Sequence, residues 1–149
     1  MLTSLGLFIS IVGCAGSRAG EDVTKPEITL AQLPGTSLAM QYRGELSIPF
    51  AMEIRNRSDD MIKVESVELW TIGDGPYLLQ GSEVRLGVEI AAGATAIVRF
   101  SMPGFSHGGG GAPTHPVTIR GSAFFDGPEG RFRTVFTRQV RQPSQTGRE

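Results

Sequence analysis

The sequence predicts an all-β protein, an antiparallel β-sandwich of about seven to nine short strands over residues 27–141. Apolar residues recur at every second position through most of this range, which is the period of a half-buried strand. Clusters of Gly, Pro, Asn and Asp separate the alternating segments roughly every eight to fourteen residues. No segment shows the period of about 3.6 residues that marks an amphipathic helix. Many short strands separated by regular turns are typical of a sandwich.

The clearest predicted strand lies at 46–54, where the even positions are apolar. Pro49 lies within it and has no N–H to donate to a neighbouring strand. We therefore expect this strand to lie at the edge of a sheet or to carry a bulge at Pro49. Weaker strands are expected before it, at 27–31 and 37–42.

The next predicted strand, 61–72, changes the phase of its alternation. The apolar residue Val64 falls on an even position, whereas Val67 falls on an odd one. One extra residue in a strand shifts the phase in this way, so we expect a β-bulge near Glu65–Ser66. A polar turn at 56–60 precedes this strand.

The remaining strands follow at similar intervals. A Gly–Asp–Gly–Pro turn at 73–76 ends the preceding strand. Apolar alternation then resumes at 84–90, 96–102, 117–125 and 132–140, with a hairpin turn at 126–130 before the last of these.

Two turns carry a resemblance to a known family. The strand that ends in Asn56 is followed by a polar turn, and an Ile–x–x–Gly turn at 90–93 precedes the strand 95–100. This combination resembles the Ig-like sandwich of the late-embryogenesis-abundant type 2 group and its small exported bacterial relatives. The resemblance implies an Ig-like sandwich and a non-catalytic role. It does not extend to antibody-type domains, because Trp70 has no disulfide to pack on.

The N-terminal segment resembles a bacterial lipoprotein signal. Residues 2–12 carry no charge, and Gly13 precedes Cys14, the only cysteine in the chain. As a helix, the apolar stretch 5–12 would cover about 12 Å, whereas a bilayer core is roughly 30 Å thick. The resemblance implies cleavage after Gly13 and attachment of lipid to Cys14. The alternative is a buried first strand in which Cys14 is a structural thiol.

This interpretation divides the chain into a signal segment, a lipidated cysteine with a flexible tether, the sandwich and a disordered tail, at 1–13, 14–26, 27–141 and 142–149. Ala15 after the cysteine favours sorting to the outer membrane. The Lys or Arg that usually begins a signal is absent, so either translation starts upstream or the signal is weak. With one cysteine, the mature chain forms no internal disulfide.

The longest predicted loop, 103–116, is the first candidate for a partner contact. It contains His107 and His115 on either side of four glycines. A metal site would need a carboxylate or thiolate beside the two imidazoles, and the loop contains no acidic residue. We therefore expect no metal and no other cofactor, although surface loops often carry binding contacts.

Enzymatic activity is not expected either. A hydrolytic triad needs a positioned base, and the only histidines lie in that glycine-rich loop. The chain contains no Gly–x–Ser–x–Gly elbow. Asp59 and Asp60 are neighbours in a turn, where carboxylates usually serve as turn formers.

A basic face is expected on the last strands. Arg131, Arg133 and Arg141 share one parity, and Arg99 and Arg120 fall on the polar faces of the two preceding strands. If these strands are neighbours, the face could bind anionic headgroups or an acidic partner. The alternative is an ordinary solvated face with acidic residues interspersed. A net charge of −1 gives no support to nucleic-acid binding.

These observations predict an envelope lipoprotein, held to a membrane by its lipid anchor, that acts as a non-catalytic interaction or structural module with an envelope protein as partner. The second hypothesis is a periplasmic or surface protein that binds a sugar, peptide or lipid at the loop 103–116. An enzyme is the third.

Overall fold

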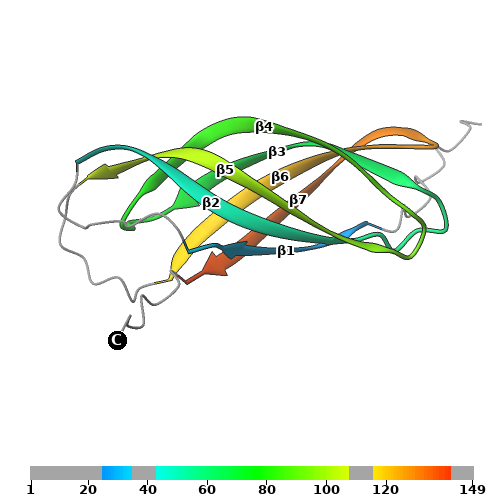
Figure 1. The fold of residues 1–149 in the computed structure, drawn as a ribbon, viewed down its shortest axis with the longest axis horizontal. Helices are drawn as coiled ribbons and strands as arrows, with labels where there is room; N and C mark the ends of the chain where they lie inside the picture. Colours follow the sequence, from blue (N-terminus) through cyan, green and yellow to red (C-terminus); the bar gives the residue numbers. More distant parts are fainter. Residues whose placement is uncertain (1–24, 35–42, 108–115, 142–149) are drawn as a thin grey trace, which may run out of the picture.

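The structure is a computed structural model that describes residues 25–34, 43–107 and 116–141 (Figure 1). These residues form seven strands and no helix. The all-β prediction is confirmed for this part of the chain, and seven strands lie within the predicted range. The strands are β1 (Glu27–Gln32), β2 (Arg43–Arg55), β3 (Ile62–Ile72), β4 (Leu78–Ile90), β5 (Thr95–His107), β6 (Val117–Gly127) and β7 (Gly130–Val140).

The seven strands form one sheet in the order β1-β2-β5-β4-β3-β6-β7, with every neighbouring pair antiparallel. The sheet curls into an almost closed, barrel-like shape in which β1 and β7 come into contact (Figure 1). The predicted Ig-like sandwich of two separate sheets is therefore not confirmed. Strand β4 joins the two halves, because Leu78 and Leu79 pair with β5 while 80–90 pair mainly with β3.

Close packing at Gly104 allows β4 to pair with β5. Gly104 is the register partner of both Leu46 on β2 and Leu79 on β4. A Cβ at this position would lie 2.8 Å from the Ile48 Cδ1 atom and 3.0 Å from the Leu78 carbonyl oxygen. A larger residue would force these groups to shift, so glycine favours the close junction between the two halves of the sheet.

Arg138 connects the two edge strands. Its Nε and Nη2 atoms donate hydrogen bonds to the Ile28 carbonyl oxygen at 3.0 and 2.6 Å, and Nη1 donates to the Thr137 carbonyl at 2.9 Å. Arg138 has the parity of the buried residues Phe136 and Val140. Because an edge strand presents unpaired backbone groups, this guanidinium satisfies a carbonyl of β1 that no strand reaches.

The core lies inside the curled sheet. The even-numbered apolar residues of β2 alternate with exposed or half-buried residues, as the sequence predicts. Four of them have no exposed surface: Ile48, Phe50, Met52 and Ile54.

Pro49 is tolerated because β1 is short. Strand β2 lies between β1 and β5, so the expectation of an edge strand is wrong for the strand as a whole. However, β1 ends at Gln32, opposite Phe50, and the Leu33 N–H donates to the Pro49 carbonyl at 2.9 Å. A residue in an antiparallel ladder directs its N–H and C=O to the same side. The nitrogen of Pro49 therefore faces the end of β1, where no strand hydrogen bond is lost.

The predicted bulge in β3 is confirmed. The register shifts between Val64 and Ser66 against both neighbouring strands. Val64 and Val67 are both fully buried on the inner face, while Ser66 pairs with the outer-face residue Arg85. The bulge thus restores the inward direction of the apolar residues after the phase change.

The Asn56 carboxamide ties the end of β2 to two turns. Its Nδ2 donates to the carbonyl oxygens of Asp60, Ile90 and Ala91 at 2.7, 3.1 and 3.1 Å. Its Oδ1 accepts from the Ser58 N–H and hydroxyl at 3.0 and 2.7 Å. The side chain is 1% exposed. The two turns that carry the family resemblance are therefore in direct contact.

Replacing Asn56 by Ala is expected to lower the free energy of unfolding by about 3 kcal/mol, because buried carbonyl groups lose their donor. Urea unfolding followed by circular dichroism measures the change. The exposed neighbour Asp59 provides the control, and Asp59→Ala is expected to have little effect. Equal losses in the two variants would show that the carboxamide is not the connecting group.

The buried phenol of Tyr77 is expected to make the fold less stable at alkaline pH. Its hydroxyl donates to Gln32 Oε1 at 2.9 Å, and burial raises the pKa of the phenol well above its ordinary value of 10.0. The folded chain keeps the phenol neutral where the unfolded chain would ionise it. This contribution is therefore fully present below about pH 10 and is lost as pH rises towards the folded pKa.

We expect the fold to lose more stability between about pH 8 and pH 11 in the wild type than in Tyr77→Phe, which cannot ionise. Urea unfolding at the two pH values measures the difference. The variant also lacks one hydrogen bond, worth about 1 kcal/mol at either pH. Identical pH dependence in the two proteins would contradict the assignment.

Candidate functional site

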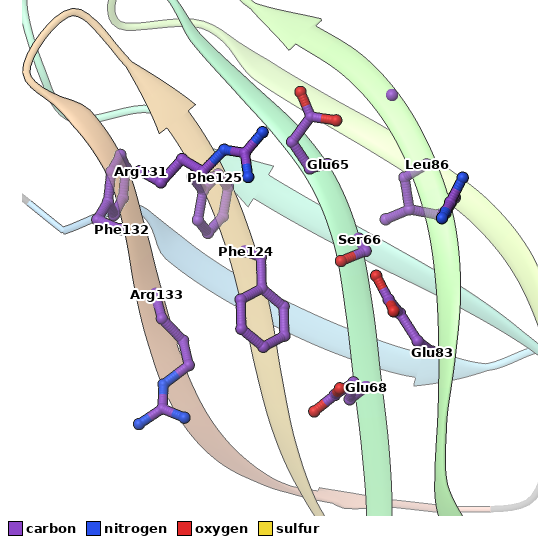
Figure 2. Close-up of a pocket in the computed structure, with 12 residues that line it drawn as sticks. Glu65, Ser66, Glu68, Glu83, Leu86, Phe124, Phe125, Arg131, Phe132 and Arg133 are labelled. Carbon is purple, nitrogen blue, oxygen red and sulfur yellow. The ribbon is translucent and has the colours of Figure 1, made fainter.

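A groove of about 850 Å³ lies on the outer face of the four adjacent strands β4, β3, β6 and β7 (Figure 2). Its size is within the range of about 300–1,000 Å³ that is usual for ligand sites. Its side chains are three glutamates, three arginines and aromatic residues, among them Glu65, Glu68, Glu83, Arg85, Arg131, Arg133 and Phe124.

The strand registers place these side chains in rows across the sheet. One row runs from Arg85 on β4 through Ser66 on β3 and Phe124 on β6 to Arg133 on β7. In the adjacent row, Glu83 lies opposite Glu68, and Glu68 lies opposite Ser122. Glutamates therefore lie on β3 and β4 together with Arg85, two arginines lie on β7, and Phe124 lies between the two sides.

The bulge in β3 contributes to the hollow. It turns Glu65 and the small residue Ser66 towards the outer face in succession, and Ser66 is 4% exposed. Opposite the bulge, Gly87 has a φ of +64° and no side chain. Figure 2 shows the half-buried Phe124 ring between Arg133 on one side and Ser66 and Glu68 on the other. Small residues beside an aromatic ring leave space that larger side chains would fill.

Most charged groups of the groove have no ionic partner in the described part of the chain. There, the one ion pair is Lys63–Glu65, with 2.8 Å between Nζ and Oε1. The hydrogen bond that Lys63 donates to Glu65, together with the negative charge of Glu65, raises the pKa of Lys63. Glu68, Glu83, Arg131 and Arg133 form no such pair among the described residues.

Glu68 and Glu83 are direct cross-strand partners on the outer face. Directly opposed residues of an antiparallel pair have Cβ atoms about 5 Å apart, and like charges in this position destabilise a sheet. The stability of the fold therefore does not explain why two glutamates lie opposite each other here. Two adjacent carboxylates are, however, suited to binding a cation supplied from outside.

The arginines predicted to form a basic face lie in different parts of the sheet. Arg131 and Arg133 line the groove, and both are exposed. Arg141 is exposed but lies beyond the end of β7, and Arg120 lies in another row, between Trp70 and Thr137.

Arg99 is separated from the other arginines, because β5 is not a neighbour of β6. The condition set by the sequence analysis, that the strands be adjacent, therefore holds for β6 and β7 but not for β5. The face that contains Arg131 and Arg133 also contains three glutamates, so its charge is mixed.

The predicted loop 103–116 begins later than expected, because the residues up to His107 belong to β5. Pro103 and His107 pair with Ser47 and Arg43 of β2 in a continuous ladder. The remaining loop residues 108–115, with His115, lie outside the described residues, as do the segments 1–24 and 142–149 with Gly13 and Cys14.

The described residues contain no group of three or more His, Cys, Asp or Glu residues placed to hold a metal ion. They also contain no helix with the length and apolar character needed to cross a membrane.

Phe124, Glu68 and Glu83 are not among the site residues predicted from the sequence. Phe124 could have been recognised from the sequence, because it is an aromatic residue at a position of the strand that alternation assigns to the polar face. The opposition of Glu68 and Glu83 has no local signal, because it depends on the register of β3 against β4.

No protein-family model and no curated protein matches this chain. Among solved structures, a protein from Archaeoglobus fulgidus has a TM-score of 0.51 and 12% identity, covering 76% of this chain and 91% of its own. A Northeast Structural Genomics Consortium target has the same score and identity, with 87% and 94% covered.

A third structure, described as an ApaA protein from Bordetella pertussis, has a TM-score of 0.48 and 23% identity, with 80% and 93% covered. The likeness to the first two shows a shared all-β fold and nothing about activity. Fold and groove together define a small antiparallel β protein with a charged groove on one outer face.

Replacing Glu83 by Lys is expected to raise the free energy of unfolding by roughly 0.5 kcal/mol at low salt, because an opposite-charge pair replaces a like-charge pair. The gain should shrink in 1 M salt, at which the screening length is about 3 Å. Glu53 on β2 is a matched control, since it is exposed and lies opposite Thr29 and Ile97. A gain in Glu53→Lys as large as in Glu83→Lys would contradict this explanation.

Proposed function

We propose that this protein is a lipid-anchored envelope protein whose β domain binds another macromolecule, without catalysis, at the outer-face groove. The observation that carries the proposal is the groove itself, where Phe124 lies among arginines and glutamates that, except for Glu65, have no ionic partner in the described chain. Binding faces commonly combine a partly buried aromatic residue with charged groups that give specificity.

The anchor is proposed from the sequence. Gly13 and Cys14 follow an uncharged apolar stretch, as in lipoprotein signals, and Ala15 favours the outer membrane. The first described strand begins at Glu27, so 12 residues separate it from Cys14. At about 3.5 Å per residue, this segment can reach about 40 Å when extended. The groove could thus be presented beyond the lipid headgroups.

The family resemblance is consistent with this proposal. The late-embryogenesis-abundant type 2 group would supply an Ig-like, non-catalytic domain, and here the two turns behind the resemblance meet at Asn56. An Ig-like arrangement could be reached from the observed sheet by dividing it at the short contact between β4 and β5.

The anchor is tested by intact mass and membrane fractionation of the native chain and Cys14→Ala. We expect a wild-type chain that begins at Cys14, carries added lipid mass and is found in the membrane fraction. The Cys14→Ala chain should lack both the lipid and the membrane association. An unmodified wild-type chain that keeps Met1 and is soluble would contradict the anchor.

Binding at the groove is tested separately, with a photo-crosslinking amino acid placed at position 124 or at position 97. Ile97 is 63% exposed on β5, outside the four strands that form the groove. We expect one envelope protein to be crosslinked in cells from position 124 and not from position 97. Equal crosslinking from both positions, or none from either, would contradict a partner site in the groove.

A further inference from the structure

We propose that the groove binds an extended polypeptide segment of a partner protein, with a cationic residue, an apolar residue and an acidic residue at alternate positions. This inference rests on the proposed function and adds the chemistry of the partner. The cationic side chain would lie at Glu68 and Glu83, the apolar one over Phe124, and the carboxylate at Arg131 and Arg133.

The separation of charges across the groove selects a dipolar ligand. The β3 and β4 side of the groove contains Glu65, Glu68 and Glu83 with a single arginine, Arg85, and is therefore acidic on balance. Arg131 and Arg133 lie on β7 at the far side of Phe124, so that side is basic. A uniformly cationic ligand would meet unpaired arginines, and a uniformly anionic one would meet unpaired glutamates. A ligand with both charges in the right order satisfies both sides.

The dimensions favour an extended segment. Glu68 and Arg133 are two strands apart, and the row of Glu68 is two residues along the strand from the row of Arg133. With about 4.8 Å between strands and about 3.4 Å per residue, their Cα atoms are about 12 Å apart. In an extended chain, residues i and i+4 lie on the same side and are about 13 Å apart. Residue i+2 then faces Phe124.

Two other occupants fit less well. A zwitterionic phospholipid headgroup holds its two charges close together on a short link, so it cannot reach Glu68 and Arg133 at once. A second copy of this chain would place one groove against another, leaving both hollows unfilled. A narrow segment that enters the groove avoids both difficulties.

The like-charge pair Glu68–Glu83 supports a binding role by its effect on folding. A pair that destabilises the free sheet gains a favourable interaction when a cation lies between its carboxylates. Glu83→Lys should therefore make the fold more stable and the binding weaker. A residue with a purely structural role would change both in the same direction.

The experiment uses the full chain in detergent micelles and fluorescein-labelled peptides, with binding measured by fluorescence anisotropy. The dipolar peptide has the sequence Thr-Lys-Thr-Val-Thr-Glu-Thr. Two controls keep the spacing but carry two lysines or two glutamates. We expect the dipolar peptide to bind at least about tenfold more tightly than either control, and more weakly as salt increases.

The protein variants locate the site. Glu83→Lys and Arg133→Glu should each weaken the dipolar peptide at least about tenfold, while Glu53→Lys on the other part of the sheet should leave binding unchanged. Thermal unfolding of each variant checks that it remains folded. Equal binding of all three peptides, or an equal loss with Glu53→Lys, would overturn the inference.

The remaining outcomes separate this inference from the proposed function. A crosslinked envelope protein at position 124 without preference for the dipolar peptide would keep the function and overturn the ligand class. Dimers that are disrupted by Glu83→Lys in sedimentation would identify a second copy as the occupant. Binding of phosphatidylethanolamine vesicles in place of the peptide would identify a lipid, and either result would overturn the inference.

Discussion

The change of partner along β4 is the constraint on which the rest of the structure depends. This strand pairs with β3 over most of its length, and only Leu78 and Leu79 pair with β5. Because of this contact one sheet curls around its own core, and β1 and β7 come together (Figure 1). Gly104 favours the contact because a Cβ at this position would crowd the Leu78 carbonyl and the Ile48 side chain. Arg138 then provides side-chain hydrogen bonds at a seam where the sheet does not close.

One irregularity in β3 serves both faces of the sheet. On the inner face, the bulge keeps Val64 and Val67 buried although their positions have opposite parity. On the outer face, it brings Ser66 beside Phe124 and Arg85, where a small side chain leaves space. The core and the groove therefore both depend on this bulge, and a substitution that removes it would disturb both.

Stability and the proposed binding make different demands on two parts of the molecule. At Asn56, the carboxamide is almost fully buried and its hydrogen bonds join its own turn, at Ser58 and Asp60, to the distant carbonyls of Ile90 and Ala91. At the groove, charged side chains are exposed, and Glu68 lies opposite Glu83 without ionic partners in the described chain. The first arrangement is typical of a structural hydrogen-bond centre. The second is typical of a surface that gains its partners from another molecule.

The sequence by itself determined the strands, because a strand that is buried on one face has an apolar residue at every second position. It also located the β3 bulge, since a phase change between Val64 and Val67 can be read directly. The prediction of an edge strand from Pro49 was wrong, because a proline is also tolerated in an inner strand where its neighbour ends, as β1 does here. Only the tertiary structure decided the order of strands, the separation of Arg99 from Arg133, and the opposition of Glu68 and Glu83. These depend on register and curl, which arise from contacts between residues that are far apart in sequence.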